Sequence, residues 1–149
     1  MQINKFFRLT FRDKLLFLYC YCLTGMFRIV ILTTSFRLIS KWFLQPREIT
    51  TNETNHTQDE KIAKNIGVMV ARASKYTPWE SKCLVQALVC KMILRQNNIA
   101  STTYIGMAKE KNSKLEAHAW ISHNEYIILG GKNSPNIYKE MARFTDNSF

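Results

Sequence analysis

The sequence is poor in cysteine, and its four cysteines, Cys20, Cys22, Cys83 and Cys90, fit neither a disulfide framework nor a zinc site. Four in 149 residues is sparse, and Cys20 and Cys22 lie two apart, where helical side chains diverge. No CxxC pair occurs, and the three histidines do not stand at ligand spacing. We therefore expect reduced thiols in a cytoplasmic protein, with no metal and no cofactor.

Acidic residues and long apolar runs are scarce near the start of the chain. Residues 1–47 hold eight basic side chains but one acid, Asp13, so this third of the chain carries +7 of the net charge of +10. The longest uncharged run, residues 15–27, is shorter than the roughly 20 residues of a membrane-spanning helix, and no signal-cleavage site follows it. We therefore expect neither a span nor a signal peptide. A basic segment of this kind suits an anionic membrane surface at the inner face of the membrane, an acidic partner, nucleic acid or solvent.

Proline is absent from residues 10–44, which carry apolar residues at helical spacing. Gly25 is expected to break this stretch into two helices, and Pro46 to end the second, because proline cannot continue the hydrogen-bond ladder. A polar linker follows. The sequence therefore predicts a basic helical N-terminal segment over residues 1–47 and a separate domain over 57–149.

The predicted domain begins with a helix and ends in strands. Thr57 and Glu60 have the spacing of a capping box, which predicts a helix over residues 58–74. Further on the pattern becomes short, β-branched and aromatic, with turn residues between the segments. These segments predict a small antiparallel sheet and hence an α+β domain: residues 101–108, 115–122 and 126–129.

Between them lies a helix that is apolar nearly all round, predicted at residues 82–96 and therefore central to its domain. Thr77-Pro78 is its expected start signal, with Ser81 as an alternative cap one turn later. Residues 97–98, both asparagine, are expected to end it in the left-handed conformation. Its polar residues form a narrow stripe: Lys82, Gln86, Lys91 and Arg95.

Cys83 and His118 are the candidate chemical groups. Cys83 is predicted in the first turn of the central helix, where unpaired backbone amides and the helix dipole stabilise a thiolate. Cys90, two turns deeper among apolar residues, is expected to be an inert packing thiol. An imidazole beside a helix-start thiol forms a nucleophilic Cys–His pair, although packing roles for both residues are the alternative.

His118 alternates with two alanines along its predicted strand. If Ala117 and Ala119 pack inward on the helix, His118 and Trp120 share the opposite face, or the lip where the helix start meets the sheet.

A family resemblance rests on the stretch YTPWESKCLVQALVCKMILRQNNIASTTYIGMAKEKNSKLEAHAWISHNEYIILGG. It resembles the transglutaminase-like cysteine protease domain of lasso-peptide biosynthesis B proteins. The pattern, over residues 74–131, is P-W-x-x-x-C-L-x-Q-A-L, a long apolar helix, a strand with I-G, then A-H-A-W and G-G. The resemblance implies a papain-like core, in which a Cys-bearing helix packs on a small antiparallel sheet, preceded by N-terminal helices.

The resemblance also implies a reaction. Cys83 would attack the peptide bond between leader and core of a ribosomal precursor peptide, with His118 moving the proton. Oxyanion donors would be backbone amides at the helix start, with Gln86 or Trp79 as lesser candidates, while Trp120 would pack beside the histidine. The chain resembles the protease half of the split form, so its partners would be a separate leader-binding protein and the lasso cyclase.

One position departs from the family pattern. A third polar group, an aspartate about twelve residues after the histidine, normally orients the ring, but here that position is Gly130. No aspartate occurs between 119 and Asp146, and Asn133 is the best substitute in the sequence. Asn133 is therefore the expected orienting residue.

Two other functions fit the same residues. A transglutaminase-type acyltransferase also uses a Cys–His pair but passes the acyl group to an amine. A non-catalytic scaffold would instead use the basic N-terminal segment to bind a membrane or a partner. Nucleic-acid binding is disfavoured, because no recognised motif accompanies the charge.

Overall fold

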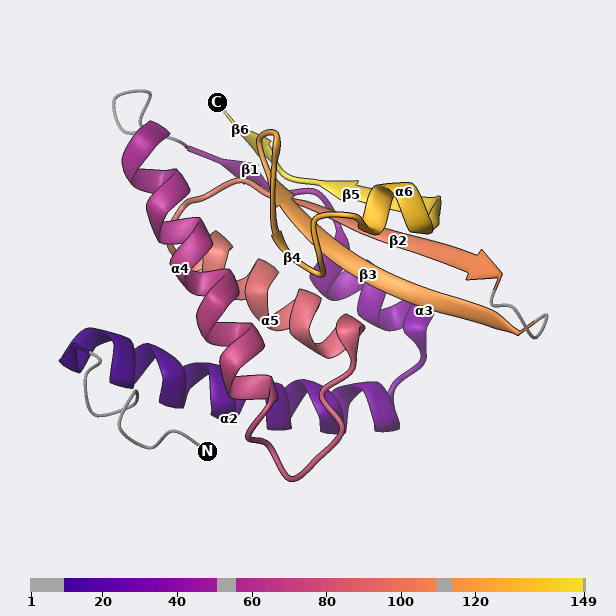
Figure 1. The fold of residues 1–149 in the computed structure, drawn as a ribbon, viewed down its shortest axis with the longest axis horizontal. Coiled ribbons are helices and arrows are strands. Elements are labelled where there is room, and N and C mark those ends of the chain that lie inside the picture. The colour runs from indigo at the N-terminus through magenta and orange to yellow at the C-terminus, as the bar shows by residue number, and fades with distance from the viewer. Residues whose placement is uncertain (1–9, 51–55, 110–113, 149) are drawn as a thin grey trace.

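The computed structural model describes residues 10–50, 56–109 and 114–148 and has an α+β fold, as the sequence predicts. Helices α2 (Phe11–Thr33), α4 (His56–Ser74) and α5 (Cys83–Gln96) pack together on one side of a four-stranded antiparallel sheet. Figure 1 shows α5 between α2 and the sheet, with the short α6 (Ser134–Ile137) on the far side of the sheet.

The sheet has the order β4-β3-β2-β5. Its members are β2 (Thr102–Lys109), β3 (Leu115–His123), β4 (Tyr126–Leu129) and β5 (Lys139–Thr145). The first three match the predicted strands within two residues at each end. β5 was not predicted, because its seven residues are mostly exposed and carry little apolar alternation.

The N-terminal residues form part of the same core. α3 (Phe36–Ile39) leads into a π-helical turn (Ser40–Leu44), and β1 (Glu48–Ile49) then pairs in parallel with β6 (Asn147–Ser148). Apolar side chains of α2 and of the turn after it are buried with those of α4 and α5. The predicted segment boundary near residue 47 therefore runs through a continuous apolar core.

Gly25 does not break α2, contrary to the sequence prediction. The helix runs without interruption from Phe11 to Thr33, and the indole of Trp79 lies against Gly25. A Cβ at that position would come within 2.9 Å of the ring. The glycine therefore serves a close approach between a helix and a side chain, and tertiary packing outweighs its low helix propensity.

The predicted helix starts also need correction. α5 begins at Cys83 with Lys82 as its N-cap, so Thr77-Pro78 lies in the loop before it and Ser81 is not the cap. α4 begins at His56, which places Thr57 inside the first turn rather than at the cap. The left-handed end of α5 is confirmed, because Asn98 has a φ of 56°.

Lys91 belongs to the narrow polar stripe of α5, and its side chain is only 1% exposed. Its ammonium donates to the Asp146 carboxylate at 2.9 Å, and Arg95 holds the same carboxylate at 2.6 Å. Arg95 also donates to the carbonyls of Phe43 and Gln45. Buried charges require such partners, and this cluster ties α5 to the start of β1 and to the end of β5.

Candidate active site

Cys83 opens α5, and its side chain is half-buried. Its Sγ lies 3.9 Å from the carbonyl oxygen of Ala117, which belongs to the peptide unit that joins Ala117 to His118. The first amides of α5 have no acceptor within the helix, since only from Gln86 onward does a backbone N–H reach back, to the carbonyl of Lys82. A negative charge that develops beside Sγ would therefore meet free N–H donors.

His118 lies on β3 with its ring on the face of the sheet away from α5. Ala119 and Ile121 belong to the core beneath the sheet, so by alternation His118 and Trp120 face the other way. The His118 ring stacks on Tyr138 with a centroid distance of 4.6 Å and lies 6.2 Å from that of Trp120. Of the two alanines expected to face inward, Ala119 is buried but Ala117 is exposed, because α5 begins beneath it and covers only the later part of β3.

The ring of His118 is oriented by a backbone carbonyl. Nε2 lies 2.7 Å from the Gly130 carbonyl oxygen, which also accepts a 2.5 Å hydrogen bond from the Ser134 hydroxyl. Because a carbonyl oxygen can only accept, Nε2 must carry the proton. In the neutral ring Nδ1 is then the basic nitrogen, and it has no hydrogen-bond partner among the described residues.

Asn133 does not take the orienting position expected for it. It is exposed at the N-cap of α6, and within the described part of the chain its side chain makes no hydrogen bond to His118. The carbonyl of Gly130 reaches the ring instead, since Gly130 adopts a φ of +98° that turns its carbonyl toward the histidine's strand. No side-chain signal in the sequence marks such an acceptor.

Cys83 and His118 lie on opposite sides of β3, with the thiol beneath the strand at the start of α5 and the imidazole on the outer face of the sheet. The thiol lies against the backbone that carries the histidine, while no hydrogen bond joins Sγ to either ring nitrogen in the described structure. Catalytic hydrogen bonds of unliganded enzymes are often long and tighten only around substrate. The structure therefore places the thiol beside the free helix-start amides, and the backbone of β3 lies between the thiol and the imidazole.

The lesser candidates have structural partners. Gln86 donates from its side-chain amide to the Ser81 carbonyl at 2.8 Å, which holds the loop before Cys83. Trp79 packs on Tyr21 of α2, and its buried indole N–H has no hydrogen-bond partner in the described residues. Trp120 stacks in parallel on Tyr104 at 5.4 Å and is a wall of the site.

The other cysteines are free thiols without a comparable setting. Burial raises the pKa of the Cys20 thiol to about 12 and raises the pKa of Cys90 further. Cys90 is fully buried and is the packing thiol that the sequence predicts. Among the described residues, no group of three or more histidine, cysteine, aspartate or glutamate side chains is placed to hold a metal ion.

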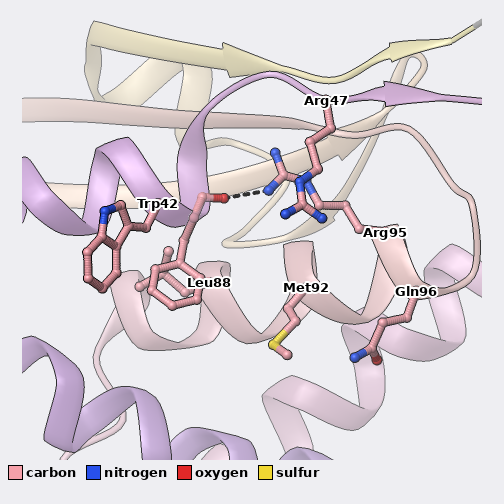
Figure 2. A pocket seen from close by; sticks show the side chains of 7 residues that line it. Trp42, Arg47, Leu88, Met92, Arg95 and Gln96 are labelled. Carbon is pink, nitrogen blue, oxygen red and sulfur yellow. Dashed lines mark hydrogen bonds between the residues drawn. The ribbon is translucent and has the colours of Figure 1, made fainter.

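Two cavities lie near these elements. The first, about 450 Å³, is on the outer face of the sheet, and two of its walls are Trp120 and Tyr138, the rings that flank His118. The second, about 310 Å³, lies along the later turns of α5. Figure 2 shows Arg95 of this second cavity bonded to the carbonyl of Phe43, so this guanidinium is already engaged in the structure.

Comparison with known proteins gives one match. Residues 28–143, well over half of the chain, match the family described as Transglutaminase-like superfamily. The matched range begins inside α2 and includes both Cys83 and His118. No curated protein matches the chain, and no solved structure matches it.

Proposed function

This chain belongs to the transglutaminase-like superfamily, and we propose that it is a cysteine peptidase that removes the leader from a ribosomal precursor peptide in lasso-peptide maturation. The superfamily supports a fold of the cysteine-protease and acyltransferase type. The finer assignment is supported by the P-W-x-x-x-C-L-x-Q-A-L and A-H-A-W patterns around Cys83 and His118.

The single observation that carries the proposal is the hydrogen bond between His118 Nε2 and the Gly130 carbonyl. It selects the tautomer in which Nδ1 is the unprotonated nitrogen, and a general base requires such a nitrogen.

The proposed reaction has two halves. Nδ1 of His118 takes the Cys83 proton, and the thiolate attacks the carbonyl carbon at the leader–core junction, with the oxyanion held by the first amides of α5. The tetrahedral intermediate collapses when Nδ1–H protonates the leaving amine of the core. Nδ1 then takes a proton from water, which attacks the thioester, releases the leader as a carboxylic acid and restores the Cys83 thiol.

The test is mass spectrometry of a precursor peptide incubated with this chain and a separate leader-binding protein. We expect Cys83→Ala and His118→Ala each to lower cleavage by about a thousandfold or more, because each removes a reacting group. Cys90→Ala is the matched control on the same helix and should cleave at the wild-type rate. Wild-type cleavage by Cys83→Ala would refute the proposal.

The same experiment separates peptidase from acyltransferase. Hydrolysis needs only water, so the leader should appear with a free carboxyl end and gain no mass from added primary amines. An amine adduct that depends on Cys83 would instead indicate acyl transfer from the same thioester. If the function survives Cys83→Ala, the chain acts as a scaffold and not through its thiol.

A further inference from the structure

α2 has an apolar stripe on the side that no other described element covers. Its members recur at intervals of three and four residues and so lie along one side of the helix: Phe11, Leu15, Leu18, Cys22, Met26 and Ile29. The five large ones are between 42% and 76% exposed, and Cys22 is exposed as well. We call these six residues the outer stripe.

The opposite side of α2 is already used. Cys20, Leu23 and Phe27 are buried in the core that α2 shares with α4 and α5, and Figure 1 shows α2 at the edge of the molecule with α4 crossing it. α2 is therefore apolar on two opposite sides, one in the core and one facing outward. Exposed apolar surface of this extent marks an interaction site.

The apolar exposure continues past the end of α2. Leu32, Phe36, Leu38 and Trp42 are all exposed, Trp42 by 65%. Tryptophan with one apolar and one polar edge is typical of the boundary between lipid headgroups and acyl chains.

The charged residues around the outer stripe indicate what kind of surface binds it. Exposed cations stand at both ends of the outer stripe, Arg12 at its start and Arg37 and Lys41 beyond its end. Two acids lie at α2: Asp13 is engaged by Thr10 and Asn65, whose hydrogen bonds lower its pKa, and Glu80 is paired with Arg28. An apolar stripe between cations, without a carboxylate of its own, complements an anionic bilayer better than it complements a protein surface.

The helix would lie on the membrane rather than cross it. Among the described helices, α2 alone is long and apolar enough to span by length and composition. Spanning would pull Cys20, Leu23 and Phe27 out of the core and expose the apolar sides of α4 and α5 to water. Lying flat, the stripe from Phe11 to Ile29 presents about 27 Å of helix to the surface at 1.5 Å per residue.

We propose that the folded protein docks on an anionic membrane surface through the outer stripe of α2. The stripe enters the boundary below the headgroups, and Arg12, Arg37 and Lys41 contact the lipid phosphates. This inference is independent of the proposed peptidase activity, because neither Cys83 nor His118 takes part.

The test is sedimentation of the full chain with vesicles of phosphatidylcholine, with and without phosphatidylglycerol. We expect binding to the anionic vesicles that weakens with salt, and a loss of about tenfold or more for Leu18→Glu or for Arg37→Glu with Lys41→Glu. Met141→Glu is the matched control, because Met141 on β5 is as exposed as Leu18. Its binding should equal that of the wild type.

Circular dichroism of each variant establishes that it is folded. Equal binding to both kinds of vesicle, or unchanged binding of the folded Leu18→Glu variant, would overturn the proposal. So would a wild-type dimer in light scattering that Leu18→Glu dissociates, because the stripe would then be covered by a second copy of the chain.

Discussion

At the scale of the residue, a main-chain oxygen orients the His118 ring, and no aspartate does so among the described residues. The Gly130 carbonyl accepts from both His118 and Ser134. A carbonyl fixes the tautomer of the ring as a carboxylate does, but it brings no negative charge to stabilise the imidazolium of the proposed reaction. We therefore expect a working but slower catalyst than a relative with the full triad.

Restoring the aspartate by Gly130→Asp should inactivate the protein rather than improve it. A Cβ at this position would come within 2.5 Å of the Trp120 Cβ, and the φ of +98° is strained for any L side chain. We expect a loss of about 1–3 kcal/mol from the backbone strain alone, measured by thermal unfolding, and a loss of cleavage. Lys132→Asp, two residues away and exposed, is the control for the added charge. A folded Gly130→Asp variant that cleaves faster than the wild type would contradict this account.

At the scale of the element, α6 is a single turn whose first residue holds the orienting carbonyl. Ser134 is buried, and its hydroxyl is the second donor to Gly130. α6 therefore holds the loop after β4 in place. It acts on the imidazole of His118 only through the carbonyl oxygen of Gly130.

Ser134→Ala should remove the hydrogen bond from the Ser134 hydroxyl to the Gly130 carbonyl. Loss of the hydrogen bond should cost about 1 kcal/mol of unfolding free energy, and turnover should fall by more than that loss of folded protein explains. The pH–rate profile of the variant should shift relative to the wild type, which a merely structural residue would not cause. Ser134→Thr, which keeps the hydroxyl, should recover part of the rate, and Asn133→Ala should behave as the wild type. An unaltered pH profile in Ser134→Ala would remove Ser134 from the site.

The elements also show what a sequence can predict. The strands beginning at Thr102 and Leu115 were foreseeable, because their alternation and turn residues are local signals. The close approach of Trp79 to Gly25 is a long-range contact, and the partner of His118 is a backbone atom. Neither leaves a pattern in nearby residues. Cys83 and His118 could be selected because their residue types carry the chemistry.

At the scale of the whole molecule, Asp146 joins segments that are distant in sequence. Its carboxylate accepts from Lys91 and Arg95 of α5 and from the backbone N–H of Arg47. Burial opposes its ionisation, but the hydrogen bonds from Arg95 and Lys91 outweigh burial and lower the pKa of Asp146 below its ordinary 3.8.

Asp146→Asn should destabilise the protein by about 3–5 kcal/mol at neutral pH, because Lys91 would stay buried without its counter-ion. A lowered folded-state pKa stabilises above the unfolded-state pKa, and this contribution is lost as the pH falls through the folded value. The difference in unfolding free energy between wild type and variant, from denaturant titrations, should therefore shrink below about pH 4. Glu140→Gln, which breaks the exposed pair with Arg143, should change stability little. A pH-independent difference would contradict the role of the Asp146 charge.

A backbone acceptor at Gly130 restricts how this site can change by mutation. Every peptide unit has a carbonyl, so no codon change can delete the acceptor of His118 in the way that one codon change deletes an aspartate. Selection at position 130 therefore acts on shape, since a side chain there meets Trp120. Substitutions that lower the proposed activity should therefore be those that move the loop after β4. No point mutation can remove the Gly130 carbonyl oxygen itself.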